Sequence, residues 1–283
     1  MRVSPWYEMP ISYLRRTSAN STLTYKNDIK AGNPAAPTRR VVRSTSLQAP
    51  QPGAKPKHRL FCGLARDRRL WLNALMFEID QLACLRGERL LFRKLGRTLA
   101  AGSLLRVAGA NGTGKTSLLR LLAGLSEPAA GQIRWQGKPI QAQREAFNAA
   151  LCYLGHAATL SDLLTPEENL HFACLSAGIA ASPQECRQTL QEIGLAAQLD
   201  LPCKVLSQGQ RRRVALARLA LAGTRPLWIL DEPFTALDQA AIEGLAGRCS
   251  AHCAAGGIVI FTSHQDVGFT QPQQVLKVED FAP

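Results

Sequence analysis

A glycine-rich stretch in the middle of the chain restricts its fold more than any other feature of the sequence. Residues 109–116 read GANGTGKT and fit the pattern G-x-x-x-x-G-K-[ST], which forms a phosphate-binding loop. Its glycines let the backbone curl so that successive N–H groups face one anion. The motif predicts that Lys115 reaches the β- and γ-phosphates of a nucleotide and that the Thr116 hydroxyl binds Mg²⁺. The predicted nucleotide-binding residues of this stretch are Gly109, Ala110, Asn111, Gly112, Thr113, Gly114, Lys115, Thr116 and Ser117.

The residues on either side of the motif match the strand and the helix that such a loop connects. The apolar run at 104–108 predicts a short buried strand, and residues 117–123 predict a helix that ends at Gly124. The amino terminus of this helix adds its dipole to the phosphate site. An ordinary glycine-rich turn would not require these flanking elements, so the sequence favours a nucleotide site.

The order of the other predicted elements indicates an α/β fold. Residues 76–85 and 90–92 predict an antiparallel hairpin, and capping boxes at Thr165 and Ser182 each predict the start of a helix. Further strands are predicted at 131–135, 150–154, 227–230, 258–262 and 275–278, with further helices from Ser207 and from Asp238. Strands and helices that alternate after the phosphate loop predict a largely parallel sheet, with an antiparallel edge and a helical insert at about 160–205.

The first quarter of the chain differs in composition from the rest. Residues 1–75 are rich in Ser and Pro and contain 14 Lys/Arg and 3 Asp/Glu, whereas residues 76–283 contain 20 and 18. We therefore predict a basic, disordered extension at 1–75 and one folded domain at 76–283. An organelle transit peptide, a true start at Met76 and a nucleic-acid-binding tail are the alternatives for the extension. Because the basic excess lies outside the predicted domain, we expect no nucleic-acid partner.

The cysteines and the hydropathy pattern carry little functional information. Eight cysteines are scattered without a CxxC pair, and Cys249, His252 and Cys253 share one helical stretch that lacks an evident fourth ligand. We expect buried free thiols rather than a zinc site. No apolar run reaches 18 residues, so the sequence predicts no membrane-spanning helix, and no secretory signal is visible.

Charged residues follow two of the predicted core strands. Asp231 and Glu232 come directly after the apolar run 227–230, and the carboxyl ends of strands in an open α/β sheet face the ligand. Asp231 therefore fits the acid that holds Mg²⁺, and Glu232 fits a base that polarises a water aimed at the γ-phosphate. His264 follows strand 258–262 and fits a hydrogen-bond donor to the same phosphate. The alternatives are solvated acids at a strand end and an ordinary surface histidine.

The segment Leu206-Ser207-Gln208-Gly209-Gln210 opens a predicted helix and resembles L-S-G-G-Q, the signature of the ATP-binding-cassette (ABC) ATPases. Five elements of that family occur in its order over about residues 76–283. They are the phosphate loop, the signature, the strand ending at 231–233, the loop 236–238 and His264. The resemblance implies a P-loop NTPase fold of the ABC type, with a parallel-sheet core, an antiparallel β edge subdomain and a helical subdomain insert.

The same resemblance implies how the site works. Two copies of the chain would close head to tail as a homodimer over two ATP and Mg²⁺. Glu232 would be the general base, His264 the γ-phosphate contact, and Thr116 and Asp231 the metal ligands. Ser207 and Gly209 would cap the γ-phosphate bound by the partner's Lys115, with the helix dipole in support. The full set of predicted contacts to the partner's ATP is Ser207, Gln208, Gly209, Gln210 and Asp238.

Three positions depart from the usual family pattern. Gln208 replaces the first glycine of the signature, and its side chain can point away from the nucleotide. Arg86 stands where most members stack an aromatic ring on adenine, and a guanidinium plane can stack on a base as well. His156 stands where the family has a Mg²⁺-contacting glutamine. For His156, a contact to the attacking water or the metal and a purely structural role both remain open.

Longer runs narrow the resemblance to the ATP-binding subunits of the haem exporters used in cytochrome c maturation. The matching runs are 84–92, 153–156, 168–172, 206–219, 227–238 and 257–264. This resemblance implies an ATPase that drives integral membrane subunits supplied by other chains. It would sit peripherally on the cytoplasmic face of the bacterial inner membrane, with 162–172 as the docking surface. We do not expect the chain to bind haem directly.

Three other functions remain open on the sequence. The first is an ABC ATPase that serves another transported substrate. The second is a non-transport ABC ATPase that acts on ribosomes or DNA, although the sequence has neither a second cassette nor a long inserted coiled coil. The third is a nucleotide-binding regulator that does not turn over ATP.

Overall fold

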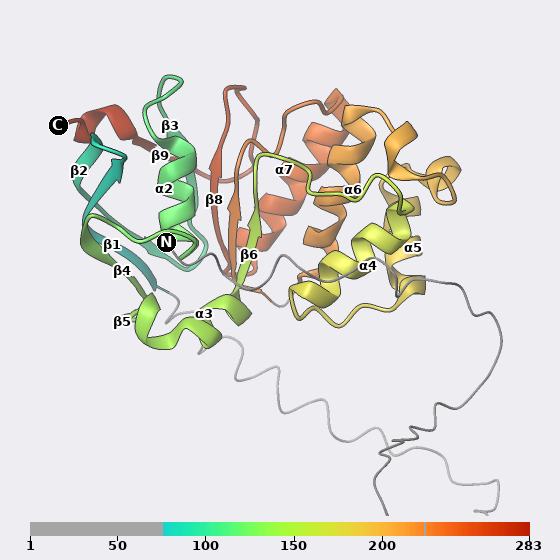
Figure 1. The fold of residues 1–283 in the computed structure, drawn as a ribbon, viewed down its shortest axis with the longest axis horizontal. Helices are drawn as coiled ribbons and strands as arrows, with labels where there is room; N and C mark the ends of the chain where they lie inside the picture. Colours follow the sequence, from blue (N-terminus) through green and yellow to red (C-terminus); the bar gives the residue numbers. More distant parts are fainter. Residues whose placement is uncertain (1–75, 224) are drawn as a thin grey trace, which may run out of the picture. The chain divides into compact units, whose positions relative to one another are not determined.

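Two β-sheets, with helices between and beside them, make up the part of the chain that the structure describes (Figure 1). The structure is a computed structural model that describes residues 76–223 and 225–283. The prediction of a disordered basic extension at 1–75 lies outside the described residues, as does Cys62.

The larger sheet is entirely parallel and presents the predicted nucleotide motifs at its strand ends. Its order is β6-β7-β8-β3-β9, and every neighbouring pair runs parallel. The strands are β3 (Leu104–Ala108), β6 (Leu151–Leu154), β7 (Leu227–Leu230), β8 (Ile258–Thr262) and β9 (Gln274–Lys277). The predicted parallel core is confirmed.

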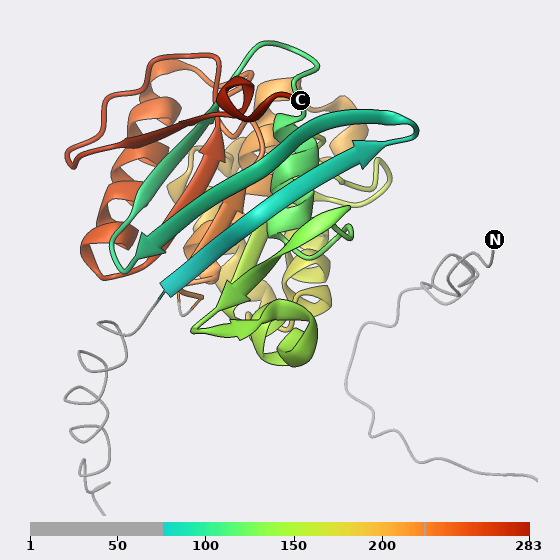
Figure 2. The same ribbon diagram turned by 90° about the vertical axis from the view of Figure 1, so that its left-hand side faces the viewer.

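The antiparallel strands form a sheet of their own, which is the β subdomain that the family resemblance implied, rather than an edge of the parallel sheet itself. The order is β2-β1-β4-β5, where β1 (Met76–Arg86) and β2 (Arg89–Ala100) form the predicted hairpin. Figure 2 shows these two long strands side by side across the front of the molecule. β4 (Ala130–Trp135) and β5 (Lys138–Pro139) complete the sheet. The second strand of the hairpin runs eight residues beyond Phe92, where the sequence pattern had suggested its end.

Helix α2 (Lys115–Leu122) lies between the two sheets (Figures 1 and 2). Its four buried leucines belong to one apolar cluster that also contains residues of both sheets, such as Phe77, Leu95 and Ile260. Alternate residues of β7 divide between two clusters: Leu227 and Ile229 face this one, whereas Trp228 and Leu230 face the other. Helices α6 (Gln208–Leu221) and α7 (Gln239–Ala254) cover that second face.

The predicted helical insert contains two helices and lies beside α6, on the far side of the parallel sheet from the hairpin (Figure 1). These helices are α4 (Pro166–Ser176) and α5 (Pro183–Glu192), and each begins with the predicted capping box, at Thr165 and Ser182. Short 3₁₀ turns follow at η3 (Ala196–Gln198) and η4 (Cys203–Val205). Among the described helices, none has the length and apolar character that crossing a bilayer requires.

Sequence reasoning missed one helix near β6. Helix α3 (Arg144–Ala150) follows the 3₁₀ turn η2 (Ile140–Gln143), and Ala150 is its last residue rather than the first residue of a strand. Only Phe147 of α3 is buried, so the segment lacks the apolar repeat from which a helix is predicted.

The seven described cysteines are buried free thiols, as predicted. Burial raises the pKa of Cys249 to about 12, with a smaller contribution from Cys253, whose own pKa burial raises to about 11. Thiols with such pKa values stay protonated at neutral pH and are poor nucleophiles and metal ligands.

His252, on the same helix, is expected to make stability depend on pH. Its ring stacks on Trp228 with centroids 3.9 Å apart, and Nε2 donates to the Pro226 carbonyl at 3.2 Å. Burial lowers its pKa, and the hydrogen bond to Pro226 opposes this only in part. The unfolded chain therefore takes up a proton near pH 6.5 that the folded chain resists. Stability is complete above that pH and is lost as the pH falls toward the folded pKa.

Denaturant titrations at pH 8 to pH 5 test this expectation. The free energy of unfolding should decline more steeply in the wild type than in His252→Phe, which keeps an aromatic ring against Trp228 without a titrating group. Equal slopes in the two proteins would show that His252 does not carry the effect.

Candidate nucleotide-binding and hydrolysis site

The phosphate loop has the curled backbone that its sequence predicts. Gly109, Gly112 and Gly114 have φ values of 152°, 83° and 104°, which only glycine adopts readily. Gly114 is the N-cap of α2, so the loop ends at a helix amino terminus. A Cβ at Gly109 would lie 2.7 Å from Thr113 Oγ1, and one at Gly114 would lie 3.1 Å from Leu91 Cδ1. The loop is therefore packed too closely for side chains at these positions.

Hydrogen bonds hold Lys115 and the loop in place. Lys115 Nζ donates to the carbonyls of Gly109 at 2.8 Å and Ala110 at 3.1 Å. The Ala110 N–H donates at 2.6 Å to Oε1 of Glu279, which lies in the C-terminal 3₁₀ turn η5 (Val278–Phe281). The Lys115 ammonium group is thus held at the loop that would bind phosphate.

A cavity of about 260 Å³ opens at this loop and brings together residues from distant parts of the sequence. Most of the predicted ATP-binding residues and both predicted catalytic residues face it. Its lining consists of Arg86, Leu91, Asn111, Gly112, Gly114, Lys115, Thr116, Ser117, His156, Glu232 and His264. Gly109, Ala110 and Thr113 belong to the same loop but are not among the lining residues.

Asp231 presents a buried oxygen that suits a metal ion. The residue is 1% exposed at the end of β7, and its Oδ1 accepts a hydrogen bond from Thr262 Oγ1 at 2.8 Å. Its Oδ2 is buried and has no hydrogen-bond partner among the described residues. An unpaired buried carboxylate oxygen is costly, and Mg²⁺ prefers oxygen ligands. Thr116 lines the cavity, as does Glu232, which directly follows Asp231, so the predicted Mg²⁺ ligands fit that ion.

Glu232 is held by its backbone on two sides. Its N–H donates to Thr262 Oγ1 at 2.7 Å, and its carbonyl accepts from Arg212 Nη2 at 2.7 Å. Its φ of 48° is rare for a residue with a side chain. Oε1 lies 3.5 Å from His264 Nε2, the limit of hydrogen-bonding distance, and has no hydrogen bond within the described part. Glu232 is thus poised with a free carboxylate oxygen beside the predicted γ-phosphate contact.

Arg86 and His156, whose roles were predicted from the family pattern, both lie at this cavity. Both are exposed and line the cavity, Arg86 from the end of β1 and His156 from the loop after β6. The backbone carbonyl of His156 accepts a hydrogen bond from Arg212 at 3.0 Å, and this bond does not involve the imidazole.

The predicted signature residues lie at the start of α6, outside this cavity. Ser207 is the N-cap, where its Oγ accepts from the Gln210 N–H at 3.2 Å and Gln210 Oε1 accepts from the Ser207 N–H at 2.9 Å. Because Oγ accepts that bond, the hydroxyl proton of Ser207 is not used in it and can be donated to another acceptor. Ser207 and Gln208 are exposed and Gly209 is half-buried, so this helix end is available to another molecule.

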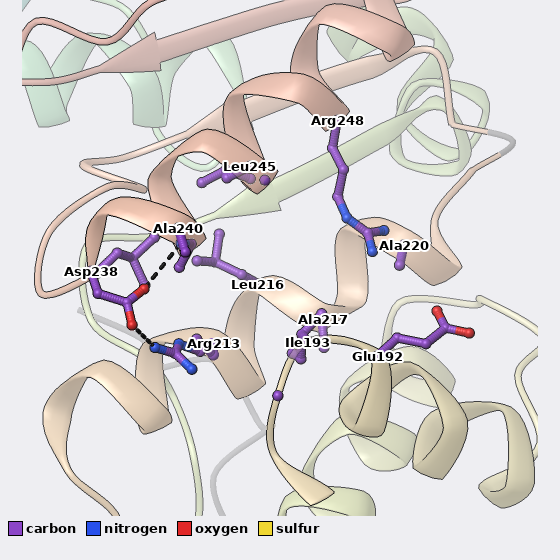
Figure 3. A pocket seen from close by; sticks show the side chains of 14 residues that line it. Glu192, Ile193, Arg213, Leu216, Ala217, Ala220, Asp238, Ala240, Leu245 and Arg248 are labelled. Carbon is purple, nitrogen blue, oxygen red and sulfur yellow. Dashed lines mark hydrogen bonds and ion pairs between the residues drawn. The ribbon is translucent and has the colours of Figure 1, made fainter.

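Asp238 is the N-cap of α7 and is bound on both carboxylate oxygens. Its Oδ1 accepts from the Ala241 N–H at 3.0 Å, and its Oδ2 pairs with Arg213 of α6. Figure 3 shows this pair at one end of a cavity of about 370 Å³, which the end of α5 and helices α6 and α7 enclose. Within one chain, Asp238 thus joins α7 to the signature helix.

Comparison with known proteins identifies the family of this chain. The model of the family described as "ABC transporter" matches residues 92–235. The "Cytochrome c biogenesis ATP-binding export protein CcmA" of Aromatoleum aromaticum is 60% identical over 73% of this chain and 97% of its own length. The protein of that name from Dechloromonas aromatica is 54% identical over 68% and 94%. The chain belongs to the ABC transporter family of ATP-binding proteins.

Solved structures agree on the fold. A putative ABC transporter ATP-binding protein from Pyrococcus furiosus superposes with a TM-score of 0.63 at 22% identity, over 74% of this chain and all of its own. A structure described as the ATP-binding subunit of an ABC transporter gives a TM-score of 0.60 at 27% identity, over 67% of this chain and 79% of its own. The predicted ABC ATPase fold is therefore confirmed.

Sequence reasoning missed residues that shape the site without an obvious motif. Leu91 packs against the phosphate loop, Glu279 binds its backbone, and Thr262 binds both Asp231 and Glu232. Thr262 alone had a usable signal, because it is a polar residue at the carboxyl end of an apolar core strand. Arg212 lay within the signature helix as one of three arginines that the sequence does not distinguish.

Gly209 should tolerate no side chain, because it touches the loop before Asp238. A Cβ at this position would lie 2.6 Å from the Ala236 carbonyl oxygen, and Ala236 itself has a φ of 62°. Gly209→Ala should therefore push the signature apart from this loop and lower the rate of ATP hydrolysis by about 10- to 100-fold. Steady-state phosphate release measures the effect.

Gly247→Ala is the matched control. Gly247 lies inside α7, and a Cβ there meets nothing within 4 Å. Its replacement should leave hydrolysis unchanged and raise helix stability slightly. If Gly209→Ala hydrolyses ATP at the rate of Gly247→Ala, close packing at Gly209 is irrelevant to turnover.

Proposed function

We propose that this chain is the ATP-hydrolysing subunit of a haem export complex in cytochrome c maturation, and that it powers separate membrane subunits. The observation that carries the ATPase part is the meeting of Lys115, Glu232 and His264 in one cavity. Asp231, which directly precedes Glu232, adds a buried Oδ2 that has no hydrogen-bond partner among the described residues. The transport part is supported by relatives named for cytochrome c biogenesis and export, because this chain matches them over nearly their whole length.

The proposed reaction is the attack of water on the γ-phosphate of ATP. Glu232 Oε1 accepts a proton from the water as its oxygen bonds to phosphorus, and the bond to the bridging oxygen of ADP breaks. Lys115 and the loop N–H groups bind the β- and γ-phosphates, and His264 donates to a γ-phosphate oxygen. Thr116 and Asp231 would hold Mg²⁺, which would neutralise charge on the phosphates. Arg86 stacks on adenine, and His156 orients the attacking water.

The site is completed by a second copy of the chain. The start of α6 is exposed at Ser207 and Gln208, and the amino terminus of a helix suits a phosphate. In the proposed homodimer, Ser207, Gly209 and their neighbours Gln208 and Gln210 cap the γ-phosphate on the partner's Lys115. Asp238 approaches the same phosphate from the loop before α7.

The helical insert supplies the surface for the membrane subunits. Leu163 is 76% exposed and Phe172 66% exposed, within the segment 162–172 that the sequence suggested for docking. Other large apolar side chains of the insert that lie open are Leu175, Leu201 and Val205. Exposed apolar side chains that gather on one subdomain mark an interaction surface. The chain then lies peripherally on the cytoplasmic face of the bacterial inner membrane and needs no direct contact with haem or nucleic acid.

Complementation tests the proposed function. The full chain is expressed in a bacterium that lacks its own cytochrome c biogenesis ATP-binding export protein, and c-type cytochromes are detected by haem staining. The wild-type chain should restore the c-type cytochromes, and Lys115→Met should not. Membrane subunits should co-purify with the wild-type chain and with Lys115→Met. Phe172→Asp should abolish co-purification while the purified chain still binds ATP.

Two results would redirect the assignment. Co-purification with membrane subunits without recovery of c-type cytochromes would indicate another transported substrate. Recovery of ribosomes or DNA in place of membrane proteins would indicate a non-transport ATPase.

A further inference from the structure

The side chains of three consecutive arginines on α6 point in three directions, because successive helical residues are about 100° apart around the axis. Arg211 binds Asp162 at 2.6 Å and the Cys203 carbonyl at 2.8 Å, both in the helical insert. Arg213 pairs with Asp238 in front of α7. Arg212 points between them into the protein and is only 5% exposed. The signature helix is therefore fixed on both sides, and its middle arginine is buried.

Arg212 binds the backbone of two loops at once. Its Nη1 donates to the carbonyls of Gly155 at 3.1 Å and His156 at 3.0 Å. Its Nη2 donates to the carbonyls of Asp231 at 2.8 Å and Glu232 at 2.7 Å. The planar guanidinium fork suits such paired acceptors, and a single ammonium point does not. One side chain thus joins the loop after β6 to the loop after β7.

The charged groups near Arg212 favour a guanidinium that stays charged and in a fixed position. Burial lowers the pKa of Arg212, and the carboxylates of Asp231 and Glu232 oppose that shift. Arginine stays protonated in proteins, so the group remains a cation that four carbonyl dipoles and two nearby carboxylates hold. The same contacts support Glu232, whose positive φ needs to be held by its surroundings.

We propose that Arg212 is a positioning residue that fixes Glu232 and His156 relative to the amino end of α6, and so links the chain's own hydrolysis site to the nucleotide that Ser207 caps on the partner. Ser207 and Arg212 are five residues apart, about 7.5 Å along one helix. A shift of α6 when Ser207 engages the partner's phosphate therefore moves the guanidinium and the two loops with it. This inference rests on the proposed function, since it assumes that Glu232 acts as base and that the homodimer forms.

Arg212→Lys tests the inference in the purified full chain. It keeps the positive charge but loses the fork that reaches four carbonyls. The turnover number should fall about 100-fold, the loss that a displacement of about 1 Å can cause. The dissociation constant for ATP should change by less than about threefold, because Arg212 is absent from the cavity lining. The Hill coefficient for ATP, if above 1 in the wild type, should fall to 1.

Arg225→Lys is the matched control. Arg225 is 8% exposed and also donates to carbonyls, those of Asn148 at 2.7 Å, Leu151 at 2.6 Å and Ala177, but near the amino end of β6. A merely structural role predicts that both variants lose the same stability and the same activity. The positioning role predicts a similar loss of thermal stability, with the fall in turnover confined to Arg212→Lys.

The outcomes separate this inference from the proposed function. An active wild type with an Arg212→Lys variant that matches Arg225→Lys in turnover overturns the positioning role and leaves the ATPase intact. A wild type that does not hydrolyse ATP even with membrane subunits overturns the proposed function itself.

If Arg212→Lys does not fold, a second measurement tests the inference with Arg212 left in place. Hydrogen exchange is followed for the amides of 229–235 in the Glu232→Gln chain, with and without Ser207→Ala. ATP should slow this exchange, and Ser207→Ala should remove most of the slowing. If ATP slows it equally in both chains, the start of α6 does not communicate with Glu232, and the inference is wrong.

Discussion

Replacing Glu232 with glutamine is expected to lower the rate of ATP hydrolysis by about 10²- to 10⁴-fold, the range that a general base contributes. The substitution keeps the size of the side chain and removes the oxygen that would accept the proton. The backbone contacts of residue 232 to Thr262 and Arg212 do not involve the side chain, so the loop should keep its conformation. The measured quantity is phosphate release at saturating ATP.

ATP binding should survive this change, and that distinguishes a lost base from a damaged site. Lys115 and the phosphate loop are untouched, so the dissociation constant for ATP should stay within about threefold of the wild type. Since the ATP-bound state would persist, ATP should also convert Glu232→Gln into a dimer detectable by size-exclusion chromatography. A Glu232→Gln chain that hydrolyses ATP like the wild type would remove Glu232 from the mechanism.

The parts of this protein that sequence predicts well are those governed by local rules. The phosphate loop depends on glycines that must adopt positive φ, and Gly109, Gly112 and Gly114 do. The starts of α4 and α5 depend on capping boxes that a four-residue window contains. The acids at the end of β7 follow from the rule that ligands bind at the carboxyl ends of parallel strands. Each of these signals lies within one short stretch of chain.

The parts that sequence did not predict depend on contacts between distant segments. Thr262 binds Asp231 across 31 positions, and Glu279 binds the phosphate loop across 169. The antiparallel strands looked like an edge of the parallel sheet, because strand patterns say nothing about which strands pair. Arg212 has the same identity as its two neighbours, and only the packing of α6 shows that it alone turns inward. Such residues become visible when the fold places four carbonyls around them.

Replacing Lys115 with methionine is expected to weaken ATP binding by about 100-fold or more. Charge-assisted hydrogen bonds contribute about 1.5–3 kcal/mol each, and Lys115 would make such bonds to both the β- and the γ-phosphate. The variant also loses the bonds from Nζ to the Gly109 and Ala110 carbonyls, which hold the side chain at the loop. Isothermal titration with a non-hydrolysable ATP analogue and Mg²⁺ measures the loss.

The control for this variant removes a positive charge from the same helix without touching the site. Arg120 lies on α2, five residues after Lys115, is exposed and does not line the cavity, so Arg120→Met should bind ATP within about twofold of the wild type. If both variants lost affinity equally, the general field of α2 rather than a direct phosphate contact would explain binding. If only Lys115→Met loses affinity for ATP, and its free energy of unfolding without nucleotide is unchanged, the fold is intact. The lost affinity then comes from direct contact between the Lys115 ammonium group and the triphosphate.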